Sequence, residues 1–165
     1  MDPIESQVWN EPSRVIAPIL LYHHVSDRPV ASRLYVSADT FRSQLRLLKS
    51  NGYASISIAQ LAKALKSSNP LPQRSVVITF DDGNEDVYEC AFPIMKEFNY
   101  TGTVYVIAGR LKMGGYLNKD QIKELIDAGW ELGSNGMNQI AINYHHEKNI
   151  PAVFYVITNI ENRGQ

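Results

Sequence analysis

The sequence contains a single cysteine, Cys90, among 165 residues, so no disulfide can form within the chain. A lone cysteine in a helix-like segment is most often a small core residue. The sequence also lacks an apolar run long enough to cross a bilayer. Residues 1–14 lack the basic start and apolar run of a signal peptide, and we expect them to form a flexible arm.

The chain has no strong excess of either charge, because 16 basic and 17 acidic residues leave a net charge of −1. A basic surface of the kind that binds nucleic acid is therefore not expected. Hydrophobic residues make up 44% of the chain and charged residues 20%, which is ordinary for a soluble globular protein. The length is sufficient for one domain with its own core, and we assign that domain to residues 15–165.

Apolar runs with β-branched residues alternate with segments of helical periodicity. We expect helices after the N-cap residues Ser37 and Asn118, and further helices at 58–68 and 87–98. Short connections between strands and helices imply parallel strands covered by helices, either as a barrel or as an open sheet. In both cases function is expected at the carboxyl ends of the strands. The expected strands are residues 15–22, 53–57, 75–80, 103–108, 130–133 and 152–158.

One internal similarity stands out, between FNYTGTVYVIAG at residues 98–109 and EKNIPAVFYVITN at residues 147–159. Two explanations are open at this point. The strands of one barrel can resemble each other, or the C-terminal segment is duplicated or recombined.

TFDDG, residues 79–83, is the strongest chemical motif in the chain. It places Asp81 and Asp82 at the end of the clearest buried strand. Neighbouring side chains diverge there, so one carboxylate can bind a metal while the other faces a reacting water. A nearby cation would keep both carboxylates ionised. The simpler alternative is an ordinary Asp-Gly turn after a strand.

The surroundings of TFDDG favour a functional interpretation. The segments LLYHHVSD, LKSNGY, VVITFDDG, FPIMKEFNYTGTVYVIAG and GYLNKDQIKELIDAGWELGS resemble, in this order, the polysaccharide deacetylases. These proteins form carbohydrate esterase family four, the NodB-homology domain. The resemblance runs from about Ile16 to Gln139, and residues 140–165 diverge from the family pattern.

The resemblance implies an α/β fold, an incomplete or distorted (β/α) barrel of the polysaccharide deacetylase type. It implies a divalent metal, usually zinc, and hydrolysis of N-acetyl or O-acetyl groups on a polysaccharide. Asp81 would be the general base and Asp82 a metal ligand. The family also implies an extracellular or cell-envelope location.

The chain departs from the family at its second motif, where Asn135 and Gln139 occupy the positions of two metal-binding histidines. A neutral amide oxygen is a much weaker zinc ligand than an imidazole nitrogen, and a catalytic zinc needs three good protein ligands. We therefore expect little bound zinc and impaired catalysis. The family's later motifs, which supply an arginine, an oxyanion donor and a histidine, are not found after Gln139.

Three hypotheses follow from these features. The chain is a deacetylase or a fragment of one, a non-catalytic relative that binds glycan or serves as a scaffold, or a damaged or recombined product. A strand edge left unpaired by an incomplete barrel would favour a homodimer.

Histidines and aromatic residues supply the remaining candidates for the site. His23 and His24 follow a strand at the functional end. One of them is expected to line the pocket, where it could serve as a further metal ligand, and His24 is a candidate for substrate binding. The alternative is a local hydrogen bond that shapes the loop. Tyr116, in a glycine-rich loop, is the candidate for stacking on a sugar. We expect core positions for Tyr105 and Trp130 and solvent exposure for His145 and His146.

Overall fold

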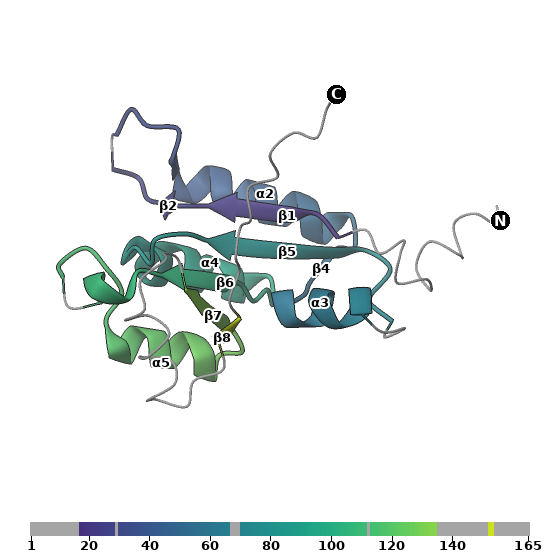
Figure 1. Ribbon diagram of the computed structural model, residues 1–165. Coiled ribbons are helices and arrows are strands. Elements are labelled where there is room, and N and C mark those ends of the chain that lie inside the picture. Colours follow the sequence, from purple (N-terminus) through teal and green to yellow (C-terminus); the bar gives the residue numbers. More distant parts are fainter. Residues whose placement is uncertain (1–16, 29, 67–69, 112, 135–151, 154–165) are drawn as a thin grey trace, which may run out of the picture.

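The computed structural model describes residues 17–28, 30–66, 70–111, 113–134 and 152–153 (Figure 1). Five strands lie side by side in one sheet, and every neighbouring pair is parallel. A sixth strand, β4 (Ala54–Ser55), pairs with the start of β5. The five strands, in their order across the sheet, are β1 (Ile19–Tyr22), β5 (Ser75–Phe80), β6 (Thr103–Val106), β7 (Glu131–Ser134) and β8 (Ala152–Val153).

Helical elements connect the strands from β1 to β7, as a parallel sheet requires. A separate short pair, β2 (His24–Val25) and β3 (Tyr35–Val36), follows β1 in the sequence and precedes the helix α2 (Ala38–Ser50). The prediction of an α/β fold with a parallel sheet is confirmed, and the described strands do not close into a complete barrel. The helical elements are α2 (Ala38–Ser50), α3 (Ile58–Lys66), η2 (Val87–Ala91), α4 (Phe92–Glu97), η3 (Ala108–Arg110) and α5 (Lys119–Asp127).

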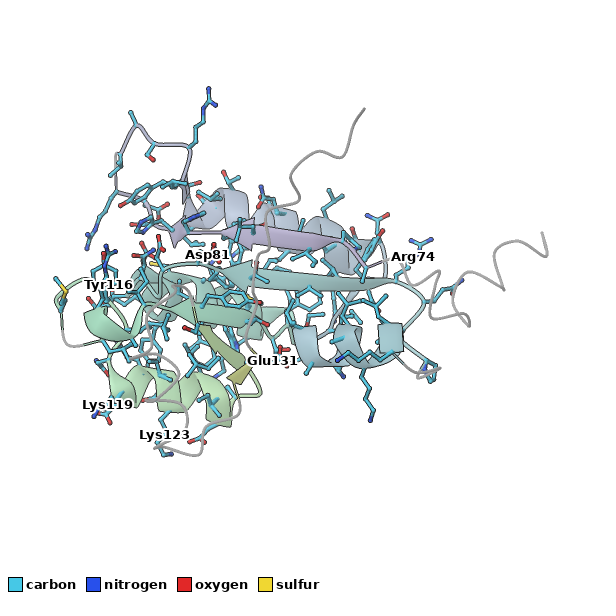
Figure 2. All side chains as sticks on the ribbon, viewed as in Figure 1. Arg74, Asp81, Tyr116, Lys119, Lys123 and Glu131 are labelled. Carbon is cyan, nitrogen blue, oxygen red and sulfur yellow. The ribbon has the colours of Figure 1, made fainter. Side chains whose placement is uncertain are left out.

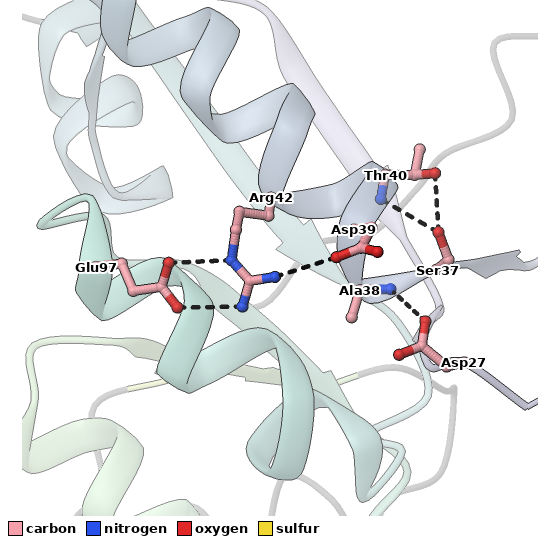
Figure 3. Close-up of polar contacts among 7 residues, drawn as sticks. All are labelled: Asp27, Ser37, Ala38, Asp39, Thr40, Arg42 and Glu97. Carbon is pink, nitrogen blue, oxygen red and sulfur yellow. Dashed lines mark hydrogen bonds and ion pairs between the residues drawn. The ribbon is translucent and has the colours of Figure 1, made fainter.

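The predicted helix starts are confirmed. Ser37 Oγ accepts a hydrogen bond from the Thr40 amide at 3.2 Å. Asp27 from the preceding loop accepts from the Ala38 amide at 3.0 Å, which satisfies a second free amide at the start of α2 (Figure 3). Asn118 and Gln121 form a reciprocal capping box at the start of α5.

The predicted helix at 87–98 has an irregular first half. Val87–Ala91 is a π-helix that continues directly into α4. Pro93 has no amide hydrogen, so it cannot make the hydrogen bond that a regular helix would require at that position. Directly before the proline, the Phe92 amide donates to the carbonyl of Val87, five residues back, where a regular α-helix would use the carbonyl four residues back. The wider turn accommodates the proline without ending the helix.

Aromatic rings form the centre of the core. Phe80 stacks on Tyr22 with ring centroids 5.6 Å apart and on Trp130 at 5.4 Å. Tyr105 and Trp130 are buried, which confirms their prediction as core residues. Cys90 is half-buried and packs against the same core.

Outside the core, Arg42 of α2 bonds both carboxylate oxygens of Glu97 of α4, at 3.1 and 3.2 Å (Figure 3).

Several predicted strands differ from the observed ones. The apolar run at 15–22 was expected to be buried, but Ile19 and Leu21 are 50% and 57% exposed. The prediction was wrong for these two residues because β1 is at an end of the sheet and the described residues leave one of its faces uncovered. The expected strand at 53–57 is reduced to Ala54–Ser55, and the one at 152–158 is described only at Ala152–Val153.

Some expectations concern parts of the chain outside the described residues. These are the arm at 1–14, the similarity between 98–109 and 147–159, and the exposure of His145 and His146. Within the described residues, no helix is both long enough and apolar enough to cross a membrane.

Glu131, the first residue of β7, fixes the start of α3 to the sheet. Its carboxylate accepts hydrogen bonds from the amides of Ile58 at 2.8 Å and Ala59 at 3.1 Å. The Thr103 hydroxyl donates a third bond at 3.1 Å. A negative charge at a helix N-terminus is favourable, because the first amides there point outward without partners. Strand and helix are thereby joined by a contact between residues more than seventy positions apart.

We expect Glu131→Ala to lower the free energy of unfolding by about 2 kcal/mol, because it removes a charged acceptor from three donors at once. Glu131→Gln should lose about half as much, since one oxygen acceptor remains. Urea denaturation would measure both, with the exposed Glu89→Ala as the control. A loss no larger than that of the control would contradict a role for Glu131 as a long-range helix cap.

Candidate functional site

The candidate site lies where the parallel strands end. Tyr22 and Phe80, the last residues of β1 and β5, are register partners. His23 and Asp81 directly follow them and are therefore neighbours at the carboxyl edge of the sheet. Figure 2 shows Asp81 at this edge, with Glu131 toward the opposite end of the strands.

A tight turn follows Asp81. Asp82 and Gly83 both have left-handed backbone conformations, with φ of 70° and 67°. Such a conformation is uncommon for a residue with a side chain and costs free energy. Gly83 also lies against β6, where an added Cβ would stand 2.9 Å from Val106 Cγ1 and 3.1 Å from its Cα. The glycine of TFDDG is thus required both by its backbone conformation and by close packing.

The segment Asp81–Asp86 is held on both sides by hydrogen bonds. Toward the loop after β1, the Asp81 amide donates to the Tyr22 carbonyl at 2.9 Å. The Asn84 side-chain amide donates to the His23 carbonyl at 3.1 Å. We call Asp81–Asp86 the acidic turn. These two bonds fix its first residues against the end of β1 and the adjoining His23.

On its other side the same segment is bonded to the glycine-rich loop between η3 and α5. The Leu117 amide donates to the Gly83 carbonyl at 2.9 Å, and the Glu85 amide donates to the Gly115 carbonyl at 3.0 Å. The acidic turn therefore forms the middle of three connected loops at the carboxyl edge.

Burial dominates the electrostatics of Asp81. The carboxyl group is partly removed from water, which raises its pKa above the ordinary value. Positive charge at His23 acts in the opposite direction and lowers the pKa, while the neighbouring Asp82 raises it. A carboxylate with a raised pKa is a better proton acceptor than an exposed one, which suits a general base.

We expect Asp81→Asn to raise the melting temperature at pH 7 in the presence of a chelator. Because the folded-state pKa of Asp81 is raised, the protonated form favours folding, and this contribution is lost as the pH rises through the folded-state pKa. The advantage of the asparagine variant should therefore shrink as the pH falls toward the ordinary aspartate pKa. Melting curves from pH 3 to pH 7 would measure it, and an advantage that grows toward low pH would contradict the raised pKa.

The two adjacent histidines point to different partners. His23 is half-buried and its charge acts on Asp81. His24 Nδ1 lies 2.8 Å from Asp86 Oδ2, and its ring stacks on Tyr35 with centroids 4.1 Å apart. His24 thus makes a hydrogen bond to a residue sixty-two positions away, and the expectation that one of the two histidines lines the pocket stays a prediction. The use of His24 in substrate binding stays a prediction.

Tyr116 is half-buried beside the acidic turn, where it forms an isolated bridge with Asn84 (Figure 2). Its hydroxyl accepts a hydrogen bond from Arg110 Nη1 at 2.7 Å, and the guanidinium lies 5.1 Å from the ring centroid. The guanidinium covers one face of the ring, so any sugar would stack on the other. Contact of Tyr116 with a glycan stays a prediction.

The part of the chain that the structure describes does not supply a complete metal site. Among the described residues, no three His, Cys, Asp or Glu side chains gather closely enough to hold a metal ion. Asn135 and Gln139 lie outside the described residues, and Asn135 directly follows Ser134, the last residue of β7. Ser134 pairs in register with Val106, so the chain reaches this motif at the same edge as Asp81.

Three polar residues of this edge were not singled out from the sequence. Asn84 bonds the carbonyl of His23, and Asp86 bonds the ring of His24; we call the segment that carries these two histidines the histidine loop. Ser134 is 9% exposed, and its hydroxyl has no hydrogen-bond partner among the described residues. The run Asn-Glu-Asp directly after TFDDG was the available signal for the first two. Polar residues that directly follow a functional turn in the sequence are candidates to form hydrogen bonds that hold the neighbouring loops in place.

Comparison with known proteins gives the same family as the sequence motifs. The family model described as Polysaccharide deacetylase matches residues 68–147. YxkH of Bacillus subtilis (strain 168), which carries the name of this family, is 28% identical over 126 residues, 76% of this chain and 44% of that protein. The poly-beta-1,6-N-acetyl-D-glucosamine N-deacetylase of Staphylococcus aureus (strain MSSA476) is 34% identical over 103 residues, 59% of this chain and 35% of that protein.

Solved structures agree with the sequence comparison. The deacetylase PplD of Streptococcus pyogenes, solved in complex with acetate, superposes with a TM-score of 0.70 at 32% identity. The superposition covers 75% of this chain and 57% of PplD. The chain thus spans less than half the length of these two curated relatives and little more than half of this structural one.

Proposed function

Because the chain belongs to the polysaccharide deacetylase family, we propose that its Asp81 site hydrolyses acetyl groups on a carbohydrate polymer. The observation that supports this most strongly is Asp81 itself. It lies at the carboxyl end of a fully buried strand, partly shielded from water, on a turn bonded to the loops on both sides. The substrate named for several relatives, poly-β-1,6-N-acetyl-D-glucosamine, makes an N-acetylated glucosamine polymer the first substrate to test.

Asp81 acts as the general base in this proposal. It takes a proton from a water molecule as the water oxygen attacks the acetyl carbonyl carbon. The bond from that carbon to the sugar nitrogen then breaks as the nitrogen receives the proton that Asp81 took up, and acetate and the free amine are released. Burial keeps the proton affinity of Asp81 high, while positive charge at His23 helps to hold it ionised before the reaction.

The family implies a divalent metal, and Asp82 is the residue of this chain proposed to bind it. The ligand set is incomplete, because the two histidine positions of the second motif carry Asn135 and Gln139. Amide oxygens bind zinc weakly, so we propose weak zinc binding and slow turnover for this chain, and no step of the mechanism is assigned to the metal.

The second candidate function is a non-catalytic glycan-binding or scaffold protein of the same fold, and the amides at 135 and 139 favour it. The ring of Tyr116 is then the proposed sugar contact, together with His24. This candidate shares the fold and the site with the first and differs in whether acetate is released.

Acetate release from N-acetylglucosamine oligomers tests the proposal. We expect slow release that falls on the order of 100-fold in Asp81→Asn. The same change at Asp127, an exposed carboxylate on α5, should leave the rate unchanged. Oligomer binding without acetate release that depends on Asp81 would overturn the first function and support the second.

Location and assembly are proposed from the family resemblance and from the open edge of the sheet. The family resemblance supports an extracellular or cell-envelope location. Within the described residues β1 pairs only with β5, so its outer edge is open to a second copy of the chain. Sedimentation velocity would detect the proposed homodimer, and a monomer at all concentrations would exclude it.

A further inference from the structure

Asp86 lies outside TFDDG and outside the proposed chemistry, yet it makes a short contact with the histidine loop. Its Oδ2 lies 2.8 Å from His24 Nδ1, and both side chains are largely buried, at 18% and 21% exposure. An ionised carboxylate only accepts hydrogen bonds, so the proton of the neutral His24 ring is expected on Nδ1. The second oxygen of Asp86 is buried without a hydrogen-bond partner among the described residues, which costs free energy.

His24 is also fixed on a second side. Its ring lies nearly parallel to that of Tyr35, at an angle of 6°. The two residues are register partners in the short pair of β2 and β3, so backbone pairing and ring stacking hold the same position. The His24 side chain is thus bonded at its edge and covered on one face, and it has little freedom to turn.

His23 is joined directly to the fixed residue His24, at a bend between β1 and β2. His23 lies between Tyr22, the last residue of β1, and His24, the first residue of β2, so fixing the side chain and strand of His24 restricts the backbone that carries His23. Tyr22 is the register partner of Phe80, which places His23 next to Asp81 at the carboxyl edge of the sheet, and the carboxyl group of Asp81 feels the charge of His23. The carbonyls of Tyr22 and His23 are also fixed, by the amide of Asp81 and the side chain of Asn84.

We propose that Asp86 is a positioning residue of the site, which holds the His23 imidazole beside Asp81 by fixing the ring of His24. Its importance for acetate release rests on the proposed function, whereas the positioning itself is a property of the free protein. Asn84 assists by fixing the His23 carbonyl. Without the Asp86 contact the His24 ring turns, the short strand β2 loosens, and His23 samples orientations away from Asp81.

Nuclear magnetic resonance of the histidine rings tests this without substrate and without added metal. In the unaltered chain we expect His24 in the Nδ1–H form and nuclear Overhauser contacts between the His23 ring and Asp81. In Asp86→Ala we expect His24 to change to the mixture of forms of a free imidazole, and the His23 contacts to Asp81 to disappear. Asp86→Asn keeps an oxygen acceptor for the Nδ1 proton and should retain both signals.

Two further variants separate positioning from general loosening. Asp27→Ala removes the cap of α2 from the same loop without touching either histidine, and it should leave the His23 contacts intact. His24→Phe keeps a ring to stack on Tyr35 but loses the bond to Asp86, and it should release His23 as Asp86→Ala does. This variant also serves if Asp86→Ala does not fold.

Persistence of the His23 contacts in both Asp86→Ala and His24→Phe would overturn the positioning role. Their loss in Asp27→Ala to the same extent would overturn it too, because any destabilisation of the loop would then suffice. If the histidine signals respond as expected while the unaltered chain releases no acetate, the proposed function fails and the positioning role stands.

Discussion

Gly83→Ala is expected to lower the free energy of unfolding by about 2–5 kcal/mol, from about 1–2 kcal/mol for a left-handed alanine and about 1–3 kcal/mol for overpacking. The φ of Gly83 is 67°, and the added methyl group would lie 2.9 Å from Val106 Cγ1 and 3.1 Å from Val106 Cα. The contact with Cα cannot be relieved by rotating a side chain, so β6 or the turn itself must move. Equilibrium urea denaturation would measure the loss.

Gly52→Ala is the matched control for this change. Gly52 has a φ of 75°, close to that of Gly83, but an added methyl group there meets nothing within 4 Å. It should therefore cost only the backbone term, about 1–2 kcal/mol. The difference between the two variants isolates the close approach of the acidic turn to β6. Equal losses would show that backbone conformation alone makes glycine necessary in TFDDG.

The local signals in the sequence predicted the local structure well. Ser37 and Asn118 cap the helices that they were expected to cap, because a cap depends on residues within one turn of the chain. The strand before Asp81 was clear from its composition, since β5 is buried along its whole length and carries only apolar or small side chains. Alternation of such elements then led to the parallel sheet and to the edge where Asp81 lies.

Contacts between distant residues were beyond the reach of the same reasoning. Glu131 was read only as part of a strand, and nothing near it in the sequence indicates the amides of Ile58 and Ala59. The exposure of Ile19 and Leu21 depends on which elements cover β1, and an apolar run does not carry that information. His24 and Asp86 are likewise sixty-two residues apart, so the sequence could suggest a local bond for one histidine but not its partner.

Asn135→His combined with Gln139→His is expected to raise the affinity for zinc on the order of 100-fold or more. Two neutral imidazoles would replace two weak amide oxygens at the positions where the family binds its metal, and each added ligand contributes strongly to zinc affinity. Competition with a chromophoric chelator would measure the change against the unaltered chain, for which we expect little bound zinc after purification without chelator. About one zinc per unaltered chain would contradict the argument from the amides.

Asp82→Ala in the double-histidine chain decides where the gained zinc binds. Two histidines four residues apart can hold zinc weakly by themselves, so a gain in affinity alone does not locate the site. If Asp82 supplies the third ligand, its removal should cancel most of the gain, while the same change at the exposed Asp39 should leave the gain intact. A gain that survives Asp82→Ala would mean that the histidine pair binds zinc away from the acidic turn, and the alignment of Asn135 and Gln139 with the metal motif would be wrong. A gain that depends on Asp82 would show that this edge of the sheet still has the geometry of a metal site and lacks only the imidazoles.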